Sequence, residues 1–399
     1  MRLFYLVFLI SHASSAYDFQ EVIKKVGDHS SVKELQARSN ELKEQASSAN
    51  SWGDPMLKLA AKNFPKDSLK KNETPMTGIE VGISQKISLV PKYHYRAQGI
   101  EELSQSKVYE SSDLKRNLIK SLWSILIDKK RIESELSIFK ENANWLNKMI
   151  AVSKKLYSNG NLSQQALLEL QIRLSELDSS INNKAIELSQ LSSNYRYFSN
   201  LEMSKLNEKT IPWQILKKNS AGNEDFKEKS IQQILKASDH KITAAKLDFI
   251  PDMTVSFGYT KRANIDDRGD FVSASISFPM PFSSKKYSNL NAVTESKIAV
   301  SKAYLNYKNY KEDRLRNFNL EISKLKSELD VLNKRTVKLA TSSKEITAKS
   351  YQLGRSTYSE LLQSELNLQK ILLRKANLEA LLLKNYLSLK YQRGDTLHE

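Results

Sequence analysis

The sequence predicts a mainly α-helical protein with a small β part, built as two tandem repeats of a short helix, two strands and a long coiled-coil helical hairpin. Three observations predict this fold class. Two long stretches contain no proline, apolar residues inside them recur every seven positions, and one turn motif occurs in both stretches at a constant offset.

Composition limits the function classes. The chain has 399 residues, of which 40% are hydrophobic and 27% charged, and it contains no cysteine and five scattered histidines. This composition argues against a disordered tail, a disulfide scaffold, a thiol nucleophile and a histidine-built metal or triad site. We therefore expect no enzyme, no catalytic residue, no metal site and no cofactor.

The formal charge of +17 raises the question of nucleic-acid binding. The basic residues are mixed with 45 acidic ones along the predicted helices, and no basic arm or Cys/His finger is present. Interleaved charges of this kind are typical of solvated helix faces. We expect no nucleic-acid partner.

The first residues indicate export. Met1-Arg2 precedes an apolar run from Leu3 to Ile10, which is too short to span a membrane, and Ser14-Ser15-Ala16 follows. One positive charge, a short apolar run and small residues are typical of a signal peptide, expected over residues 1–16.

Proline placement locates the two hairpins. All eight prolines lie outside 92–211 and 282–399, at Pro55, Pro65, Pro75, Pro91, Pro212, Pro251, Pro279 and Pro281. Inside these stretches apolar residues form heptad rows, such as Leu118, Ile125, Ile132, Phe139 and Leu146, and Phe318, Leu325, Leu332, Leu339 and Ile346. A 3.5-residue period predicts knobs-into-holes packing of paired helices.

Each hairpin turns at a glycine within matching sequences. The first runs from Tyr157 through Gly160, Leu162 and Ser163, and the second from Tyr351 through Gly354, Ser356 and Thr357. Glycine ends one helix and a Ser or Thr caps the next, so Ser163 and Thr357 are the expected N-caps. The match in register indicates an internal duplication.

Alternating segments before each hairpin predict strands. Apolar residues alternate with small polar ones at Met253, Val255, Phe257 and Tyr259 and again within 272–278. The segments 57–61 and 79–83 also have apolar residues at alternate positions. A shorter helix precedes each pair, near Ser31 and Ser230. Four strands are too few to close a barrel across a bilayer, so a barrel would require several chains.

The expected organisation follows from these signals. It comprises a signal peptide (1–16), a first repeat (17–205, with strands at about 54–64 and 78–90 and a hairpin at about 95–205), a second repeat (206–393, with strands at about 252–262 and 270–281 and a hairpin at about 284–393), and a tail (394–399).

Together, the signal peptide, the two repeats and the Tyr-x-x-Gly turns resemble the TolC family of outer-membrane efflux proteins over about residues 17–393. The resemblance also includes Gly53-Asp54-Pro55-Met56-Leu57 and Phe249-Ile250-Pro251-Asp252-Met253, which enter the first and third strands. It implies a homotrimer that forms a 12-stranded outer-membrane β-barrel continued by a periplasmic α-helical barrel.

As the resemblance implies, the protein acts as a passive duct for drugs, metal ions or other small molecules and contacts outer-membrane lipid. Its partners are a periplasmic adaptor and an inner-membrane pump of the RND or ABC type. The adaptor docks at the hairpin tips, at Tyr157, Gly160, Leu162, Ser163, Tyr351, Gly354, Ser356 and Thr357.

The resemblance also implies a constriction just after the second turn. Aligned on Gly354, its two ring positions fall on Glu360 and on Gln363, which is uncharged, and the matching residue of the first repeat is Ala166. Three Glu360 carboxylates at a trimer mouth would repel one another and attract cations. An ordinary solvated acid early in a helix is the equal alternative.

Two alternatives remain open from the sequence. The Asp54-Pro55-Met56-Leu57 entry and the chain length favour the heavy-metal RND branch, although no Met, His or Cys cluster and no lipid-anchor cysteine occurs. A periplasmic adaptor of the membrane-fusion type is the alternative function, but such a protein carries one hairpin rather than two.

Overall fold

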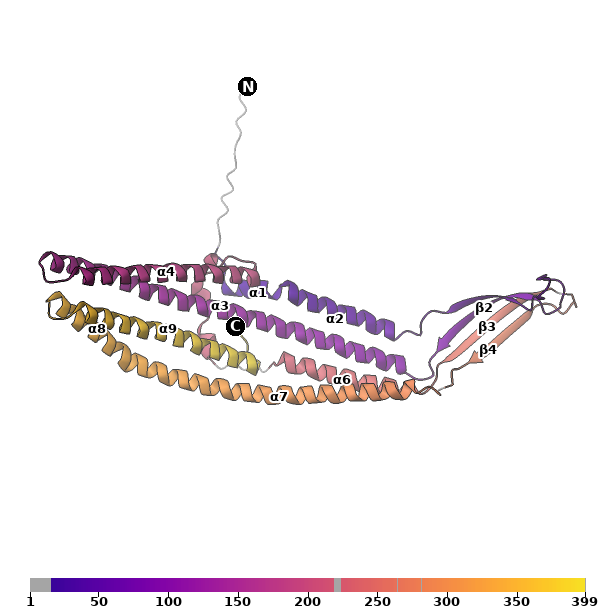
Figure 1. Ribbon diagram of the computed structural model, residues 1–399. Coiled ribbons are helices and arrows are strands. Elements are labelled where there is room, and N and C mark those ends of the chain that lie inside the picture. Colours follow the sequence, from indigo (N-terminus) through magenta and orange to yellow (C-terminus); the bar gives the residue numbers. More distant parts are fainter. Residues whose placement is uncertain (1–15, 219–223, 264, 281, 399) are drawn as a thin grey trace, which may run out of the picture. The chain divides into compact units, whose positions relative to one another are not determined.

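The computed structural model describes residues 16–218, 224–263, 265–280 and 282–398 (Figure 1). The expected signal peptide, 1–16, lies outside the described residues except for Ala16. The chain divides into two compact units, and each takes segments from both sequence repeats. Unit 1 holds Met1–Lys33, Ser112–Asp225 and Asn309–Glu399, and unit 2 holds Glu34–Ser111 and Phe226–Lys308.

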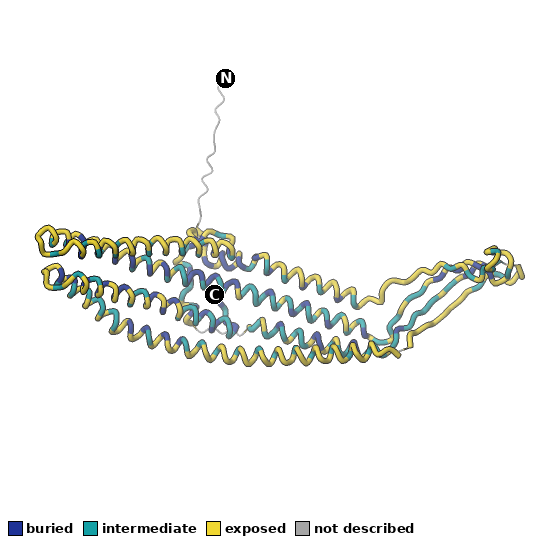
Figure 2. Tube along the Cα trace, in the orientation of Figure 1, coloured by how far each residue is buried: buried dark blue, intermediate teal, exposed yellow. Residues whose placement is uncertain are grey.

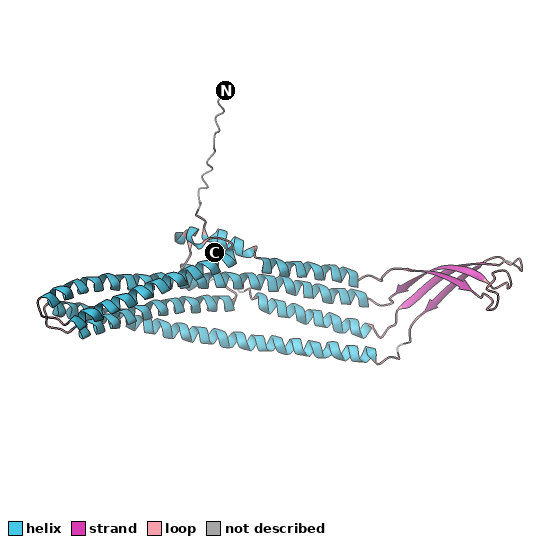
Figure 3. Ribbon diagram, turned by 45° about the horizontal axis from the view of Figure 1, so that its top comes forward, coloured by secondary structure: helices cyan, strands magenta, loops and turns pink. Residues whose placement is uncertain are grey.

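Unit 2 contains one antiparallel sheet of four strands in the order β1-β2-β3-β4. The strands are coloured magenta in Figure 3. The strands are β1 (Met56–Lys62), β2 (Gly78–Ile87), β3 (Met253–Arg262) and β4 (Phe271–Ser277). The central pair joins the two sequence repeats, with Val81 opposite Tyr259 and Gly82 opposite Gly258. The outer edges of β1 and β4 have no strand partner among the described residues.

The sheet has one apolar and one polar face, as the alternation predicts. Opposite residues across all four strands, Leu57, Ile83, Phe257 and Ala274, share the apolar face. Its large side chains are exposed, including Phe257 at 57%. Most of β1 and β4 is coloured as exposed in Figure 2. An apolar face left uncovered in one chain is a surface that must meet lipid or another protein.

The polar face is built around a buried carboxylate. Glu80 is 5% exposed and forms ion pairs with Lys58 and Lys62. Gly258 makes room for it, because a Cβ at that position would lie 2.8 Å from Glu80 Oε1. Small residues therefore let a charged side chain lie flat against the sheet.

The helices of unit 2 approach closely through small residues. They are α2 (Ser30–Ala49), α6 (Phe226–Leu247) and the first parts of α3 (Lys92–Ser158) and α7 (Lys285–Val331). The hydroxyls of Ser39 and Ser104 are 2.9 Å apart, as are those of Ser106 and Ser230. Each buried hydroxyl thus has a partner, which offsets the cost of its burial.

The strands join the helices through an ion-pair network. Lys92, at the start of α3, is buried, and its Nζ lies 2.7 Å from Asp252, which immediately precedes β3. Asp252 also pairs with Lys86 and accepts a hydrogen bond from the Tyr93 hydroxyl. Because each buried charge has an opposite partner, the cost of burial is offset.

Unit 1 contains the larger part of the two hairpins, including both turns. The first consists of α3 and α4 (Gln164–Ser199); the second consists of α7, a π-helical turn (Leu332–Thr336), α8 (Val337–Gln352) and α9 (Tyr358–Arg393). The heptad row from Leu118 to Leu146 is buried as predicted. The repeat order of short helix, two strands and long hairpin is confirmed, and the barrel expected from the resemblance remains a prediction.

The second heptad row was predicted wrongly beyond Leu332. Leu339 and Ile346 are 67% and 66% exposed, whereas Ala348 and Tyr351 are buried in their place. The π turn explains this difference, because its i→i+5 hydrogen bonding adds a residue to one turn and rotates everything after it. A strict heptad reading cannot anticipate such a phase change.

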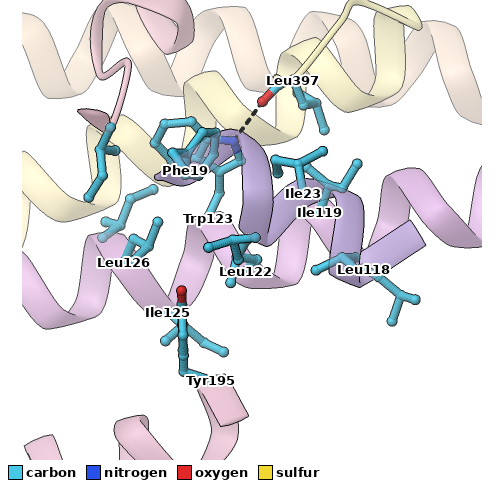
Figure 4. Close-up of a cluster of buried hydrophobic side chains, with 14 of the residues drawn as sticks. Phe19, Ile23, Leu118, Ile119, Leu122, Trp123, Ile125, Leu126, Tyr195 and Leu397 are labelled. Atoms are coloured by element: carbon cyan, nitrogen blue, oxygen red, sulfur yellow. Dashed lines mark hydrogen bonds between the residues drawn. The ribbon is translucent and has the colours of Figure 1, made fainter. Parts of the chain in front are cut away.

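A belt of short segments surrounds Trp123 of α3. It includes α1 (Phe19–Gly27), α5 (Gln214–Lys217) and the chain end near Leu397. The Trp123 ring lies 4.9 Å from Phe19 and 5.6 Å from Trp213, and its Nε1–H donates to the Leu397 carbonyl at 2.7 Å (Figure 4). The indole thereby joins three segments that are remote in sequence.

Candidate functional site: the two hairpin turns

The two turns have the same backbone geometry. Gly160 and Gly354 lie at φ +73° and +70°, a left-handed conformation that favours glycine. Asn161 N–H donates to the Leu156 carbonyl and Arg355 N–H to the Ser350 carbonyl, both at 2.8 Å. These bonds form a Schellman motif, which satisfies carbonyls at the end of each helix.

The expected caps begin the helices that follow. Ser163 Oγ accepts from the Ala166 N–H at 3.2 Å, and Thr357 Oγ1 accepts from the Glu360 N–H at 3.2 Å. The second turn has an additional bond, because Glu360 Oε2 accepts from the Thr357 N–H at 2.9 Å. This reciprocal pair is a capping box, which Ala166 cannot form in the first turn.

Glu360 therefore has an observed structural role. Its carboxylate is exposed and accepts a bond from the Ser356 hydroxyl at 2.6 Å, and this bond and those of the cap hold its pKa below the usual value. Gln363 is also exposed and donates to Asn367 at 3.2 Å. The capping explains an acid at this position, and the constriction role of both residues remains a prediction.

The two matching tyrosines differ in environment. Tyr351 is 1% exposed, and its hydroxyl hydrogen-bonds with the buried Ser153 of the first hairpin at 2.7 Å. Tyr157 is 44% exposed. The two tips pack together in one apolar cluster that includes Ile150, Tyr351 and Leu361, with Leu162 at its margin. Tyr351 thus joins the hairpins, while Tyr157 remains accessible.

A buried polar network close to the turns was not predicted from the sequence. Glu365 of α9 is fully buried, and its Oε2 lies 3.3 Å from Arg173 Nε of α4. Arg173 also binds Gln369, which accepts from Asn142 of α3. The only sequence signal was an acid between core leucines, which does not reveal its partners.

Burial is the main influence on the pKa of the Glu365 carboxyl. It raises the pKa of Glu365, and the Arg173 guanidinium only partly opposes it. Glu365 Oε1 has no hydrogen-bond partner among the described residues. A carboxyl that is desolvated and half-satisfied favours its neutral form.

We expect Glu365 to make stability depend on pH. An acid with a raised folded-state pKa stabilises the fold below its unfolded value, and this contribution is lost as pH rises through the folded value. The melting temperature of the protein relative to Glu365→Gln should therefore fall as pH rises above the unfolded value of the carboxyl, about 4.3. Circular-dichroism melts across this range test it.

The matched control is Glu176→Gln, which removes the solvent-exposed partner of Arg173. An exposed ion pair contributes little, so this change should shift the melting temperature slightly. A difference between the protein and Glu365→Gln that did not vary with pH would contradict the burial account.

Within the described ranges, no helix is long and apolar enough to cross a membrane. Among the same residues, no three His, Cys, Asp or Glu side chains are grouped so that they could hold a metal ion.

Comparison with known proteins places the fold. No protein-family model matches the chain, and a search of curated protein sequences gave no significant match. Solved structures do match. The outer-membrane channel OprN aligns with a TM-score of 0.77 and 13% identity over 94% of this chain and 90% of that one.

Two further structures agree. The outer membrane protein VceC from Vibrio cholerae has a TM-score of 0.77 and 13% identity, covering 94% of this chain and 96% of that one. The Campylobacter jejuni CmeC outer membrane channel has a TM-score of 0.75 and 12% identity, covering 94% and 85%. The chain therefore has the fold of TolC-like outer-membrane channels, which confirms the single-chain fold expected from the resemblance.

Proposed function

We propose that this protein is a passive trimeric duct in the bacterial outer membrane with a periplasmic extension. The observation that carries the proposal is an amphipathic four-stranded sheet, joined to two helical hairpins in a channel fold, whose two outer edges have no strand partner in the described part of the chain. Edge strands with free N–H and C=O groups favour pairing with another chain. An adaptor, the alternative function, has one hairpin and leaves this sheet unexplained.

Three copies supply twelve strands. Pairing β4 of one copy with β1 of the next satisfies both open edges and closes a barrel, which has no edges left. The apolar face around Phe257 then contacts outer-membrane lipid, and the polar face around Glu80 lines the lumen. The hairpins extend into the periplasm as a helical barrel.

The duct works with other proteins. Its hairpin tips dock a periplasmic adaptor, and an inner-membrane pump of the RND or ABC type supplies the energy. Drugs, metal ions or other small molecules pass through it. The heavy-metal branch indicated by the Asp54-Pro55-Met56-Leu57 entry remains a prediction within this proposal.

Glu360 and Gln363 are the proposed constriction. Glu360→Gln retains an oxygen that can accept the Thr357 N–H, so the variant removes charge while preserving the capping box. In planar bilayers, reversal potentials should show a weaker cation preference for Glu360→Gln and a stronger one for Gln363→Glu, because fixed carboxylates concentrate cations. Single-channel recording in a salt gradient measures this.

Glu345→Gln is the control, because Glu345 is exposed on the same hairpin but lies before the turn. It should leave the reversal potential unchanged. A protein that forms no channels in lipid would refute the duct. If the unmodified protein and Glu360→Gln formed channels with the same cation preference, only the constriction would be refuted.

A further inference from the structure

The hairpin tips carry mostly positive charge. We define the tip surface as the exposed side chains of 142–168 and 346–360. The first segment contains no acidic residue, and the second contains only Glu360. The exposed basic residues of this surface are Lys148, Lys154, Lys155, Lys349 and Arg355.

The ion pairing of these five cations differs from that of other cations on the hairpins. No ion pair joins any of the five to a described acidic residue. Farther from the turns the hairpins do contain ion pairs, such as that of Arg131 with Glu135 at 2.7 Å. The carboxylate of Glu360 is already bound by Ser356 and the Thr357 N–H. Desolvating this surface is therefore favourable only against a partner that supplies negative charge.

Apolar side chains and bare backbone lie among the charges. Leu353 and Ile346 are 68% and 66% exposed, and Tyr157 is 44% exposed. A Cβ added at Gly160 or Gly354 would meet no atom within 4 Å, so both glycines leave open space at the turn. A helix end from another protein can approach the backbone closely there.

We propose that the tip surface binds a helical-hairpin tip that is acidic and carries exposed apolar side chains. This inference rests on the proposed function and specifies the adaptor that the duct accepts. Opposite charges steer the encounter and fix the register, and the apolar contacts retain the complex. A partner with basic tips is rejected, because like charges would be brought together.

The test uses designed probes and the full-length protein in neutral detergent. Each probe is a trimeric coiled coil ending in three helical hairpins, whose turns carry leucine and either Glu, Gln or Lys at the exposed positions. Fluorescence anisotropy should show that the Glu probe binds at least about tenfold more tightly than the Gln probe, with the advantage lost at high salt. The Lys probe should not bind.

Charge reversal supplies the matched variants. Lys154→Glu with Lys155→Glu should weaken the Glu probe about tenfold or more and should allow the Lys probe to bind. The control is Lys140→Glu with Lys338→Glu, which changes net charge equally at exposed positions outside the tip surface. The control should bind the Glu probe as the unmodified protein does.

Three results would overturn the inference: equal binding of the Glu and Gln probes, equal losses in the tip and control variants, or binding to phosphatidylglycerol vesicles that the tip reversal abolishes. The last result would indicate a lipid-binding surface. Channel recording on the same preparation separates the two proposals. If the protein forms channels but does not bind the Glu probe, this inference alone is overturned. If it binds the Glu probe but forms no channels, the proposed duct is overturned.

Discussion

Replacing Phe257 with arginine should abolish the membrane-inserted assembly. Phe257 lies in the middle of β3 on the exposed apolar face, opposite Ile83 and Ala274. A cation on the lipid face near the bilayer midplane costs about 2–4 kcal/mol, and a trimer incurs this cost in every chain. The measurement is the fraction of protein recovered in outer-membrane vesicles as an assembly that resists SDS without heating.

Ser275→Arg is the matched control, because Ser275 lies in the neighbouring strand on the polar face. There the arginine would point into a hydrated lumen, so membrane recovery should be nearly unchanged. If Ser275→Arg were lost from the membrane and Phe257→Arg retained, the two faces of the sheet would be assigned in reverse.

Trp123→Ala should cause the largest loss of stability in the helical part. The indole is fully buried, contacts Phe19 and Trp213, and donates a hydrogen bond to the Leu397 carbonyl. Truncating a buried tryptophan costs about 3–5 kcal/mol through lost burial and the remaining cavity. Thermal melts should show this loss, and limited proteolysis should cut the chain near its ends.

Two variants make this prediction specific. Trp123→Phe preserves most of the ring contact but leaves the Leu397 carbonyl without its donor, so it should lose part of the stability. Trp52→Ala changes a tryptophan that is 53% exposed and should have little effect. Equal melting temperatures for Trp123→Ala and Trp52→Ala would show that the belt contributes no stability.

The turns and strands could be predicted because their signals are local. Gly160 and Gly354 adopt the left-handed conformation that glycine favours, and Ser163 and Thr357 accept the bonds that N-caps accept. Strand alternation likewise depends on near neighbours, so the apolar and polar faces of the sheet followed from the sequence.

The remaining features depend on contacts that are distant in sequence. The π turn at Leu332–Thr336 shifts the helix phase without any proline or glycine to indicate it. The belt around Trp123 brings together α1, Trp213 and Leu397, none of which has a repetitive pattern. Glu365 forms an ion pair with Arg173 of another helix, and a single sequence does not show which two distant charges will pair.

The trimeric duct is best tested by the mass of the particle that mild detergent extracts from a membrane fraction. We expect a particle of three chains, after correction for bound detergent, that migrates as a trimer on an unheated SDS gel and as a monomer after boiling. Such a result follows from β4 pairing with β1 between copies. A monomer or dimer found in the soluble periplasmic fraction would contradict the shared barrel and favour the adaptor.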